Sequence, residues 1–408
     1  MKDSGIPWIG EIPSDWGVEQ LSGLFIEHKN KNSDLSETNL LSLSYGKIIR
    51  KDINTKEGLL PQSFDGYNVI EKGDIVFRLT DLQNDKRSLR TGLCTERGII
   101  TSAYVTLRKR QDLDSAFFHY LFHSYDICKV FYGLGDGVRQ GMNYSDLRKL
   151  AVLYPPHPTQ QRIADFLDRK CAEIDELAAL QQTMIAELKR YKQSVITEAV
   201  TKGLDPDVPM QDSGVEWIGK IPEGWEVKRL KFVANRRNEK ADDTTLKYIG
   251  LEHIVGFSKE MVETENVYDN EGANMCYDRD VIFGKLRPYL GKAKVIEDTC
   301  CCSSEFLVLC NVHCPDYLRY LMLSGWFIEI VNASTYGTKM PRANADFIMN
   351  MLIPVPRATE QQQIADYLDK KCAEIDELIA IKQQKIEALK EYKKSVIFEY
   401  VTGKKEVL

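Results

Sequence analysis

The residues with the most obvious chemical potential are thiols gathered in the second half of the chain. The cluster comprises Cys300, Cys301, Cys302, Cys310 and Cys314, with His313 beside them. Structural zinc sites use ligands in pairs that are spaced two to four residues apart. Consecutive side chains on a strand point to opposite faces, and the first half of the chain has no matching cluster. The pattern therefore favours small core residues over a metal site.

Two short patterns resemble parts of a methyl-transferring enzyme, and both are incomplete. Gly133, Gly135 and Gly137 could form a cofactor-binding turn, but no βαβ pattern surrounds them, which favours a loop. The segment Tyr154-Pro155-Pro156-His157 has two prolines without the polar–Pro–Pro–aromatic order of a catalytic tetrapeptide. A phosphate-binding loop with GK[ST] is also missing from the sequence. We therefore predict a protein that is not an enzyme, with no catalytic, cofactor-binding or metal-binding residues.

The remaining polar candidates are of the types that bind DNA. Arg, Lys, Asn and Gln donate hydrogen bonds to base edges, and positive charge binds phosphates. In the first half they follow a strand-like DIVF segment or lie in the loop GDGVRQGMNYSDLRK, directly before a predicted short helix. These residues are Arg78, Lys86, Arg87, Arg90, Arg139, Gln140 and Asn143.

The second half places similar residues at equivalent positions. Lys285, Arg287 and Lys292 follow the strand-like VIF segment, and the later loop TYGTKMPRANADF contributes Lys339, Arg342 and Asn344. Two glycine-bearing loops with the same location and different residues are typical of a shared DNA-binding surface. A net charge of −6 argues mildly against nucleic acid, although local basic stretches can coexist with acidic helices.

Length and composition set the broad class of protein. The 408 residues are enough for two domains, and 43% hydrophobic with 28% charged residues is ordinary for a globular protein. No apolar run is long enough to span a bilayer, and the N-terminal sequence MKDSGIPWIG lacks the pattern of a signal peptide. Ten cysteines in a chain of this size do not form a small secreted framework. We expect a cytoplasmic protein with reduced thiols.

The strongest feature of the sequence is an internal repeat. DSGIPWIGEIPSDWGVEQL at 3–21 matches DSGVEWIGKIPEGWEVKRL at 212–230 at 11 of 19 positions. Residues 163–201 match 364–402 at 26 of 39 positions. The stretches between these frames diverge, which predicts two modules that do the same job on different targets. Trp8, Trp16, Trp217 and Trp225 are identical between copies, so we interpret them as anchors of the frame.

Each diverged insert has a mixed α and β pattern. LLSLSY, DIVFRL, AYVTL and YIGLEHI are short, apolar or alternating runs that predict strands. Aromatic residues at three- and four-residue spacing predict helices over 114–131 and 315–332.

The repeated segment after the inserts predicts a long helix in each copy, with Thr159 as the N-cap of the first and ends near Gly203 and Gly403. The predicted apolar stripe is Ile174, Leu177, Met184, Leu188, Tyr191 and Val195, with Ile375, Leu378, Ile386, Leu389, Tyr392 and Val396 in the second copy. A helix of about 40 residues is about 60 Å long, so the simplest burial packs the two stripes together as an antiparallel coiled coil.

The order of segments predicts a circular organisation. The first long helix leads into a DSG–WIG segment, whereas no such segment follows the second long helix. A DSG–WIG segment also opens the chain, so the N-terminus can complete the unit to which the second helix belongs. The fold class we predict is α+β, with two mixed α/β domains joined by two long antiparallel coiled-coil helices; the family resemblance given next implies that these are target recognition domains. The expected domains are 1–155 (first mixed domain), 156–203 (first long helix), 204–356 (linker and second mixed domain) and 357–408 (second long helix and tail).

The frame resembles a known family. DSGIPWIGEIP, QQRIADFLD, KCAEIDEL and ITEAVTKGLDPDVPM, twice over in this order, resemble the specificity subunit of type I restriction–modification systems. The resemblance implies that each insert recognises one half of a split, asymmetric DNA sequence and that the helices set the spacing. It implies as partners double-stranded DNA, two methyltransferase subunits and motor-nuclease subunits, and no membrane. S-adenosylmethionine and ATP would then be bound by those partners, so we expect no cofactor in this chain.

Two other classes remain open at this point. A non-catalytic coiled-coil adaptor, whose globular heads bind other proteins, would share the repeat and the long helices. It would show no salt-dependent binding to duplex DNA, which a DNA-recognition subunit requires. A piece of a fused enzyme with its own methyltransferase is the third class, and the missing cofactor motifs count against it.

Overall fold

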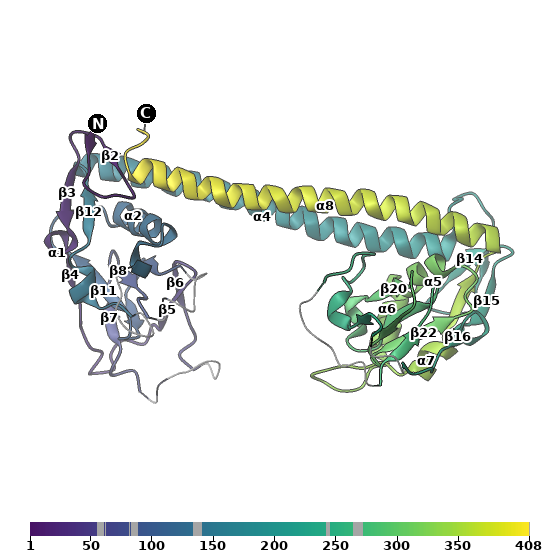
Figure 1. Cartoon of the computed structure of the whole chain (residues 1–408). Coiled ribbons are helices and arrows are strands. Elements are labelled where there is room, and N and C mark those ends of the chain that lie inside the picture. The colour runs from purple at the N-terminus through teal and green to yellow at the C-terminus, as the bar shows by residue number, and fades with distance from the viewer. Residues whose placement is uncertain are drawn as a thin grey trace. The chain divides into compact units, whose positions relative to one another are not determined.

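The computed structural model describes residues 1–54, 61, 63–80, 82, 89–133, 141–241, 245–263 and 272–407. The chain divides into two compact units. Unit 1 contains residues 1–180 and 384–408, and unit 2 contains residues 181–383. Each of the two long helices, α4 (His157–Lys202) and α8 (Ala358–Val401), contributes one part to each unit (Figure 1).

Unit 1 is built on a four-stranded antiparallel sheet. Its strand order is β4 (Phe25–Glu27), β11 (Val105–Lys109), β8 (Ile75–Phe77) and β9 (Thr91–Leu93). The β-branched and aromatic residues of β8 are all buried, as a central strand requires. Antiparallel pairs flank it: β1 (Lys2–Asp3) with β2 (Glu11–Ile12), β3 (Gly17–Gln20) with β12 (Ala151–Tyr154), β5 (Leu41–Ser44) with β6 (Lys47–Arg50), and β7 (Asn68–Ile70) with β10 (Gly98–Ile100).

Helix α2 (Ser115–Ile127) carries the aromatic core of unit 1. Asp114 caps it by accepting a hydrogen bond from the Phe117 N–H at 2.9 Å. The ring centroids of Phe118 and Phe122 lie 5.2 and 5.8 Å from that of Phe25 in edge-to-face geometry. The short helices of the unit are α1 (Leu21–Leu24), the 3-10 helix η1 (Val130–Gly133) and α3 (Tyr144–Leu147).

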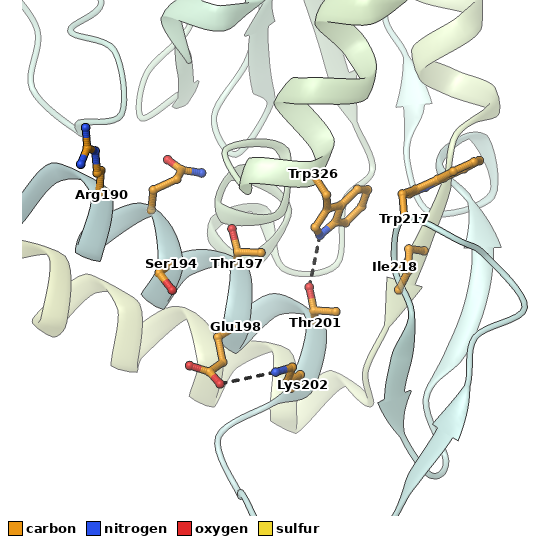
Figure 2. Close-up of a pocket in the computed structure, with 10 residues that line it drawn as sticks. Arg190, Ser194, Thr197, Glu198, Thr201, Lys202, Trp217, Ile218 and Trp326 are labelled. Carbon is orange, nitrogen blue, oxygen red and sulfur yellow. Dashed lines mark hydrogen bonds and ion pairs between the residues drawn. The ribbon is translucent and has the colours of Figure 1, made fainter. Parts of the chain in front are cut away.

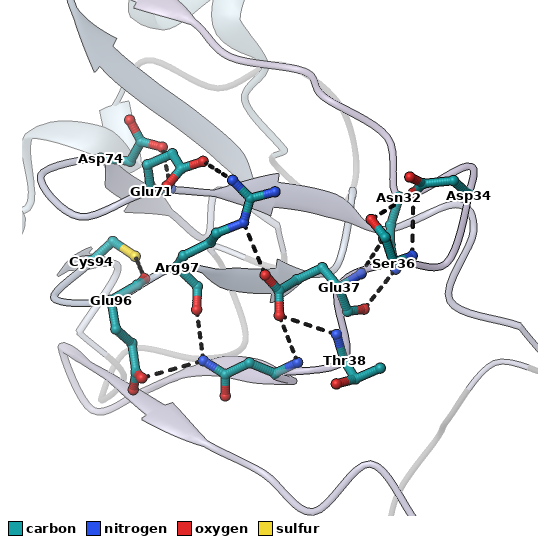
Figure 3. Close-up of polar contacts among 11 residues, drawn as sticks. Asn32, Asp34, Ser36, Glu37, Thr38, Glu71, Asp74, Cys94, Glu96 and Arg97 are labelled. Atoms are coloured by element: carbon teal, nitrogen blue, oxygen red, sulfur yellow. Dashed lines mark hydrogen bonds and ion pairs between the residues drawn. The ribbon is translucent and has the colours of Figure 1, made fainter.

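A polar network fixes the segment that leads into β5. Arg97 donates from Nε to Glu37 at 3.0 Å and from Nη1 to Glu71 at 2.8 Å (Figure 3). Asn39 donates to the backbone carbonyl of Arg97 at 2.7 Å and to the Glu96 carboxylate at 3.3 Å. Because charge-assisted contacts join segments about 60 residues apart, the β5–β6 hairpin is held to the β7–β10 pair.

Unit 2 repeats most of the strand plan of unit 1. Its four-stranded sheet has the order β16 (Asn235–Arg236), β22 (Phe306–Cys310), β19 (Val281–Gly284) and β20 (Ala293–Val295). β15 (Glu226–Arg229) pairs with β23 (Leu352–Val355), and β13 (Met210–Asp212) pairs with β14 (Lys220–Pro222). β18 (Asn274–Cys276) and β21 (Cys300–Cys302) pair at the positions of β7 and β10, and β17 (Tyr248–Ile249) extends this pair to a three-stranded sheet. The repeat therefore extends through the inserts whose sequences have diverged.

The cysteines of β21 are buried side chains of this three-stranded sheet. Cys302 lies with its Sγ 3.3 Å from the Sγ of Cys276 on β18, whereas the Cys301 thiol contacts the backbone carbonyl of Lys247 at 3.7 Å. Among the residues that the structure describes, no group of three or more His, Cys, Asp or Glu side chains is placed to hold a metal ion.

The helices of unit 2 correct one prediction. The single helix expected over 315–332 is wrong, because α5 (Pro315–Met322) ends and α6 (Gly325–Ala333) begins anew. Ser324 between them has an extended backbone, and the Gly325 N–H donates to the Thr197 hydroxyl on α4 at 2.8 Å. The other helices are α7 (Ala345–Asn350) and the 3-10 helices η2 (Leu230–Phe232), η3 (Leu251–His253) and η4 (Pro288–Leu290). The helix expected over 114–131 likewise ends at Ile127 and is followed by η1.

The long helices pair in antiparallel fashion within each unit, as predicted. In unit 1 the rings of Phe166 and Tyr400 lie 4.4 Å apart. In unit 2 the Lys382 ammonium lies 3.4 Å from the Met184 sulfur. Buried or half-buried positions on α4 recur at alternating three- and four-residue steps, the spacing of a heptad seam. They are Ala164, Leu167, Cys171, Ile174, Ala178, Gln181, Ile185, Leu188, Lys192, Val195 and Ala199.

The predicted apolar stripe is wrong at two positions in each helix. Leu177 and Tyr191 on α4 are 46% and 51% exposed, and Leu378 and Tyr392 on α8 are 47% and 50% exposed. In the observed seam, the residue after Ile174 lies four positions later rather than three. These exposed side chains therefore lie beside the seam and not in it. The expected N-cap at Thr159 is wrong as well, because α4 already begins at His157.

The circular organisation is confirmed by the ends of the long helices. Gly403 after α8 has a φ of +69°, and a Cβ there would lie 3.2 Å from the buried ring of Trp16. Gly203 after α4 has a φ of +76° and meets Trp225 in the same way. The DSG–WIG segment that opens the chain thus packs on the end of the second long helix in unit 1. No helix in the described part of the chain has the length and apolar character to cross a membrane.

Candidate nucleic-acid interface

In each unit, described residues of the two predicted DNA-binding segments contact each other. In unit 1 the Met142 N–H donates to the carbonyl of Leu79, just beyond β8, at 2.9 Å. In unit 2 the Ala343 N–H donates to the carbonyl of Lys285, just beyond β19, at 2.9 Å. The two contacts are equivalent in the repeat, so each unit brings the end of the same strand against the same later loop.

In unit 2 this junction is lined with basic side chains. Arg342 is 44% exposed at its side chain and forms an ion pair with Glu305, with Nε 2.9 Å from the carboxylate. Lys339 is exposed in the same loop. The Arg287 N–H donates to the Pro341 carbonyl at 2.7 Å, and its Nη2 lies 3.5 Å from the Lys339 carbonyl. The arginines of the two loops thus share one surface.

Arg287 has an unusual backbone conformation. Its φ of +50° and ψ of +61° lie in the left-handed region, which non-glycine residues adopt at a cost and mainly at functional sites. Its buried Nε finds no hydrogen-bond partner among the residues that the structure describes. Such a group retains donor capacity for a ligand, and the guanidinium suits the O6 and N7 acceptors of guanine.

The two lysines near Arg287 are already engaged. The Lys285 ammonium donates to the Ser304 carbonyl at 2.9 Å, and burial lowers the pKa of this lysine. Lys292 donates to the Leu251 carbonyl at 2.6 Å. Both side chains are half-buried, so their bonds to backbone oxygens hold the loops in place.

Asn143 and Asn344 cap equivalent helices. Asn143 Oδ1 accepts from the Ser145 N–H at 2.7 Å and begins α3, and Asn344 Oδ1 accepts from the Asp346 N–H at 2.7 Å and begins α7. Both residues are exposed. A cap uses the amide oxygen and leaves the NH2 group available for an acceptor on a base.

Arg90 differs from the other candidates because its side chain is fully buried. Its Nη1 donates to the Thr80 carbonyl at 2.8 Å, its Nε lies 3.5 Å from the Tyr132 hydroxyl, and its backbone N–H donates to Asp126. The structure thus gives Arg90 a supporting position behind the loop, and we do not retain it as a DNA contact. Arg78, next to it in the sheet, is half-buried.

Four predicted residues, Lys86, Arg87, Arg139 and Gln140, lie outside the described residues, as do most of the glycines of the loop around Gly135. Sequence reasoning also missed exposed aromatic and apolar residues at the junction in unit 2. Tyr336 and Met340 are 61% and 55% exposed and stand in the same loop as Lys339. The sequence TYGTKM, with a tyrosine before a glycine in a basic loop, was the available signal.

The matching family is the type I restriction modification DNA specificity domain, whose model matches residues 13–190 and 222–391. These two ranges cover most of the chain. The chain therefore belongs to this family, and it is the DNA sequence recognition subunit of a type I restriction–modification system.

Relatives agree with this assignment. The MjaVIII type I restriction enzyme specificity subunit of Methanocaldococcus jannaschii is 25% identical over 334 residues, which cover 76% of this chain and 75% of the relative. The putative MjaX specificity subunit of the same organism is 23% identical over 424 residues, with 97% and 95% covered.

Solved structures share the fold. The HsdS subunit from Thermoanaerobacter tengcongensis has a TM-score of 0.52 at 15% identity, and the alignment covers 96% of this chain and 98% of that one. A chain from a structure that concerns complex assembly and conformational transition of the type I R-M system has a TM-score of 0.69 at 15% identity. The alignment covers 96% of this chain and 98% of that one. The predicted fold, two mixed α+β domains joined by two long helices, is thereby confirmed.

Proposed function

We propose that each unit recognises one half of a split, asymmetric duplex sequence through the junction of its two loops. The observation that carries this proposal is the pair of equivalent backbone hydrogen bonds, Met142 to Leu79 and Ala343 to Lys285. These hydrogen bonds fix the same backbone arrangement in both units, whereas the side chains at the two junctions differ. Two domains that recognise different half-sites need this combination. Asymmetry of the target follows from that difference.

The proposed DNA contacts in the described part of unit 2 leave out Lys285 and Lys292, because their ammonium groups already donate to backbone carbonyls. Our proposal is that Arg287 and Asn344 read base edges and that Lys339 and Arg342 bind phosphates; all four side chains are exposed or half-buried. In unit 1 the described candidates are Arg78 and Asn143, and Lys86, Arg87, Arg139 and Gln140 stay predictions. Lys285 and Lys292 act through the shape of the loop.

We further propose that two copies of a methyltransferase subunit dock on surfaces that the repeat duplicates. The exposed apolar residues of the repeated frame include Trp8, Leu177, Leu180 and Tyr392 in unit 1, and Trp217, Leu378, Ile381 and Tyr191 in unit 2. The two sets are equivalent position by position, and exposed apolar side chains on a repeated frame favour one partner bound twice.

The surface beside Trp217 in unit 2 contains a cavity. Trp217 lines this cavity of about 520 Å³ beside the last turns of α4, together with Trp326, whose indole N–H donates to the Thr201 hydroxyl at 3.2 Å (Figure 2). Trp8 and Trp217 are 39% and 45% exposed, whereas Trp16 and Trp225 are buried. The first pair therefore suits a partner surface and the second pair anchors the frame.

On this account the chain performs no catalysis itself. Methyl transfer with S-adenosylmethionine and translocation with ATP belong to the methyltransferase and motor-nuclease partners. The competing function is an adaptor whose globular domains bind proteins rather than DNA.

Duplex binding at graded salt concentrations separates the two functions. The purified chain, alone and with its methyltransferase partner, is titrated with duplexes that contain or lack the methylated motif. We expect log Kd to rise linearly with log salt, at roughly 0.9 per phosphate contacted, and to favour the motif duplex. Binding to the partner without any salt-dependent DNA binding would support the adaptor.

A further inference from the structure

Exposed apolar side chains occur on both segments of the loop junction of unit 2, where residues 285–292 meet residues 335–344. Tyr336 and Met340 in the second segment are more than half exposed, and Tyr289 and Leu290 in the first are exposed as well. Large apolar groups are unfavourable in water, and several of them on one surface commonly mark a binding site. The charge and the backbone of the junction indicate what binds there.

The two segments are basic. Residues 285–292 and 335–343 contain no acidic residue and five basic ones, which are Lys285, Arg287, Lys292, Lys339 and Arg342. Among the residues that the structure describes, the carboxylate that forms an ion pair with this group is Glu305, which binds Arg342. The positive charges therefore outnumber the carboxylates paired with them. This excess favours a polyanion such as duplex DNA, rather than an apolar protein surface, as the occupant.

Met340 lies in a loop whose backbone is fixed on both sides. The Arg342 N–H donates to the Tyr336 carbonyl at 3.1 Å, and the Tyr336 N–H donates to the Arg342 carbonyl at 3.3 Å, which closes the loop 337–341. Arg342 also forms an antiparallel bridge with Leu286, just beyond β19. Pro341 restricts the backbone directly after Met340. The loop can therefore present Met340 to a ligand with little further loss of conformational entropy.

The sequence of unit 1 has a different residue at the position of Met340. The equivalent helix caps Asn143 and Asn344 align the two loops at an offset of 201 residues. Position 340 then corresponds to Arg139. An apolar residue in one copy and a cation in the other predict different kinds of DNA contact at the same place in the two loops.

We propose that Met340 inserts between two adjacent base pairs of the half-site that unit 2 recognises and kinks the duplex there. This inference rests on the proposed function of the loop junction. Methionine is among the apolar side chains that act as wedges in DNA-binding proteins and partly unstack one base step. Lys339 and Arg342 lie on either side of Met340 in the sequence, and their contacts with phosphates would offset the cost of unstacking.

Insertion makes Met340 a specificity-determining residue that forms no hydrogen bond with a base. Pyrimidine–purine steps such as TA and CA/TG are unstacked and kinked more easily than other steps. The half-site of unit 2 should therefore contain such a step at the point of insertion. The half-site of unit 1, which meets Arg139 at the equivalent position, should not be unstacked in this way.

The test uses the full chain without its methyltransferase partner, so that base flipping by that partner cannot contribute. Duplexes of the methylated motif carry the fluorescent base 2-aminopurine at one position at a time, and its fluorescence rises when the base is unstacked. We expect the unsubstituted chain to raise the fluorescence at one step of one half-site. Met340→Gln, which is polar and of similar length, should abolish this rise and weaken binding by about tenfold. Met340→Leu keeps an apolar wedge and should keep the rise.

Leu204→Gln is the matched control. Leu204 is 42% exposed just after the end of α4 and outside the loop junction, so this variant should change neither the fluorescence nor the affinity. Far-UV circular dichroism and the unfolding midpoint establish that each variant is folded. The salt slope of binding should be the same in all variants, because none of them removes a phosphate contact.

The outcomes separate this inference from the proposed function. A fluorescence rise that persists in Met340→Gln overturns the insertion, even if binding stays salt-dependent. A loss of affinity in Met340→Gln with no rise in the unsubstituted chain also overturns it and indicates an apolar contact within a groove. Binding by the unsubstituted chain that lacks any salt dependence overturns the proposed function, and the insertion with it.

Discussion

Lys192 on α4 donates from its ammonium to both carboxylate oxygens of Asp376 on α8, at 2.8 and 2.6 Å. The lysine side chain is 8% exposed and also donates to the backbone carbonyl of Phe257 at 2.9 Å. The repeat reproduces the ion pair in unit 1, where Lys393 lies 2.7 Å from Asp175. A charged residue in the apolar seam of a coiled coil restricts its register, so this pair selects one antiparallel alignment.

Removing the carboxylate from this pair should destabilise unit 2. Asp376→Asn leaves the buried Lys192 charge with a weaker partner, and we expect a loss of about 2 kcal/mol, reduced from the fully buried case because Asp376 is partly exposed. Urea unfolding followed by circular dichroism measures it. Asp175→Asn is the matched control and should cost less, because Lys393 is 27% exposed. Equal losses in the two variants would contradict this explanation.

Arg287→Ala should change sequence preference more than it changes overall affinity. If Arg287 reads a guanine, the variant loses about 10- to 100-fold in affinity for the cognate duplex and tolerates other bases at one position. Competition binding with duplexes substituted one base pair at a time measures this. Arg342→Ala should instead weaken all duplexes similarly and lower the salt slope by about one. If both variants showed the same profile, the assigned roles would be wrong.

Arg90→Met should act on stability and leave the number of DNA phosphate contacts unchanged. The buried guanidinium bonds to the Thr80 carbonyl and lies over the Tyr132 ring at 5.7 Å. Its loss removes this charge-assisted hydrogen bond and the contact with the ring, which we expect to cost about 1–3 kcal/mol. Chemical unfolding measures the stability, and the salt dependence of duplex binding is compared with the unsubstituted chain. A salt slope lower by about one would show that Arg90 does bind phosphate.

The partner surfaces can be disrupted one at a time. Leu177→Glu with Leu180→Glu alters unit 1, and Leu378→Glu with Ile381→Glu makes the equivalent change in unit 2. We expect each pair of substitutions to reduce the number of methyltransferase subunits bound per chain from two to one, and the four together to abolish binding. Analytical ultracentrifugation of the mixed proteins reports the stoichiometry. Full occupancy in the fourfold variant would exclude this surface.

The histidines of α2 predict how stability depends on pH. The pKa values of His119 and His123 are lowered to about 3 and about 4 from an ordinary value of 6.5. The unfolded chain therefore binds more protons below pH 6.5, so stability falls as the pH falls from 6.5 toward 4, by at most about 1.4 kcal/mol per pH unit for each histidine. Thermal unfolding between pH 7 and pH 5 should show a flatter dependence in a variant with His119→Phe and His123→Phe. An unchanged slope would contradict the prediction.

The parts of the fold that the two copies share could be predicted from the sequence, because their sequence patterns occur twice. Two copies of the DSG–WIG segment and of the long helix revealed the circular organisation, which the packing of Trp16 at the end of α8 confirms. The heptad register of the two long helices was harder to predict from the sequence. Leu177 and Tyr191 looked like seam residues because they are apolar. The seam instead contains buried Gln181 and Lys192, and Lys192 is paired with Asp376 of the other helix.

The candidate site shows the same limit. Strand ends and glycine-bearing loops located the junction, because both signals are local. Whether an arginine faces solvent depends on contacts far along the chain, and Arg90 is buried by Asp126 and Tyr132, about 40 residues later. Arg287, whose backbone is left-handed, likewise donates its N–H to Pro341 in the second loop. Long-range contacts of this kind leave no mark in the local sequence.

The most direct test of the account exchanges the first insert. Residues 22–150 are replaced by the corresponding segment of a relative with a different target, and methylated adenines are mapped across the genome of cells that carry the hybrid and its methyltransferase partner. The account predicts that one half of a split, asymmetric motif changes while the other half stays the same. A change in both halves, or methylation of the original motif by the hybrid, would contradict it.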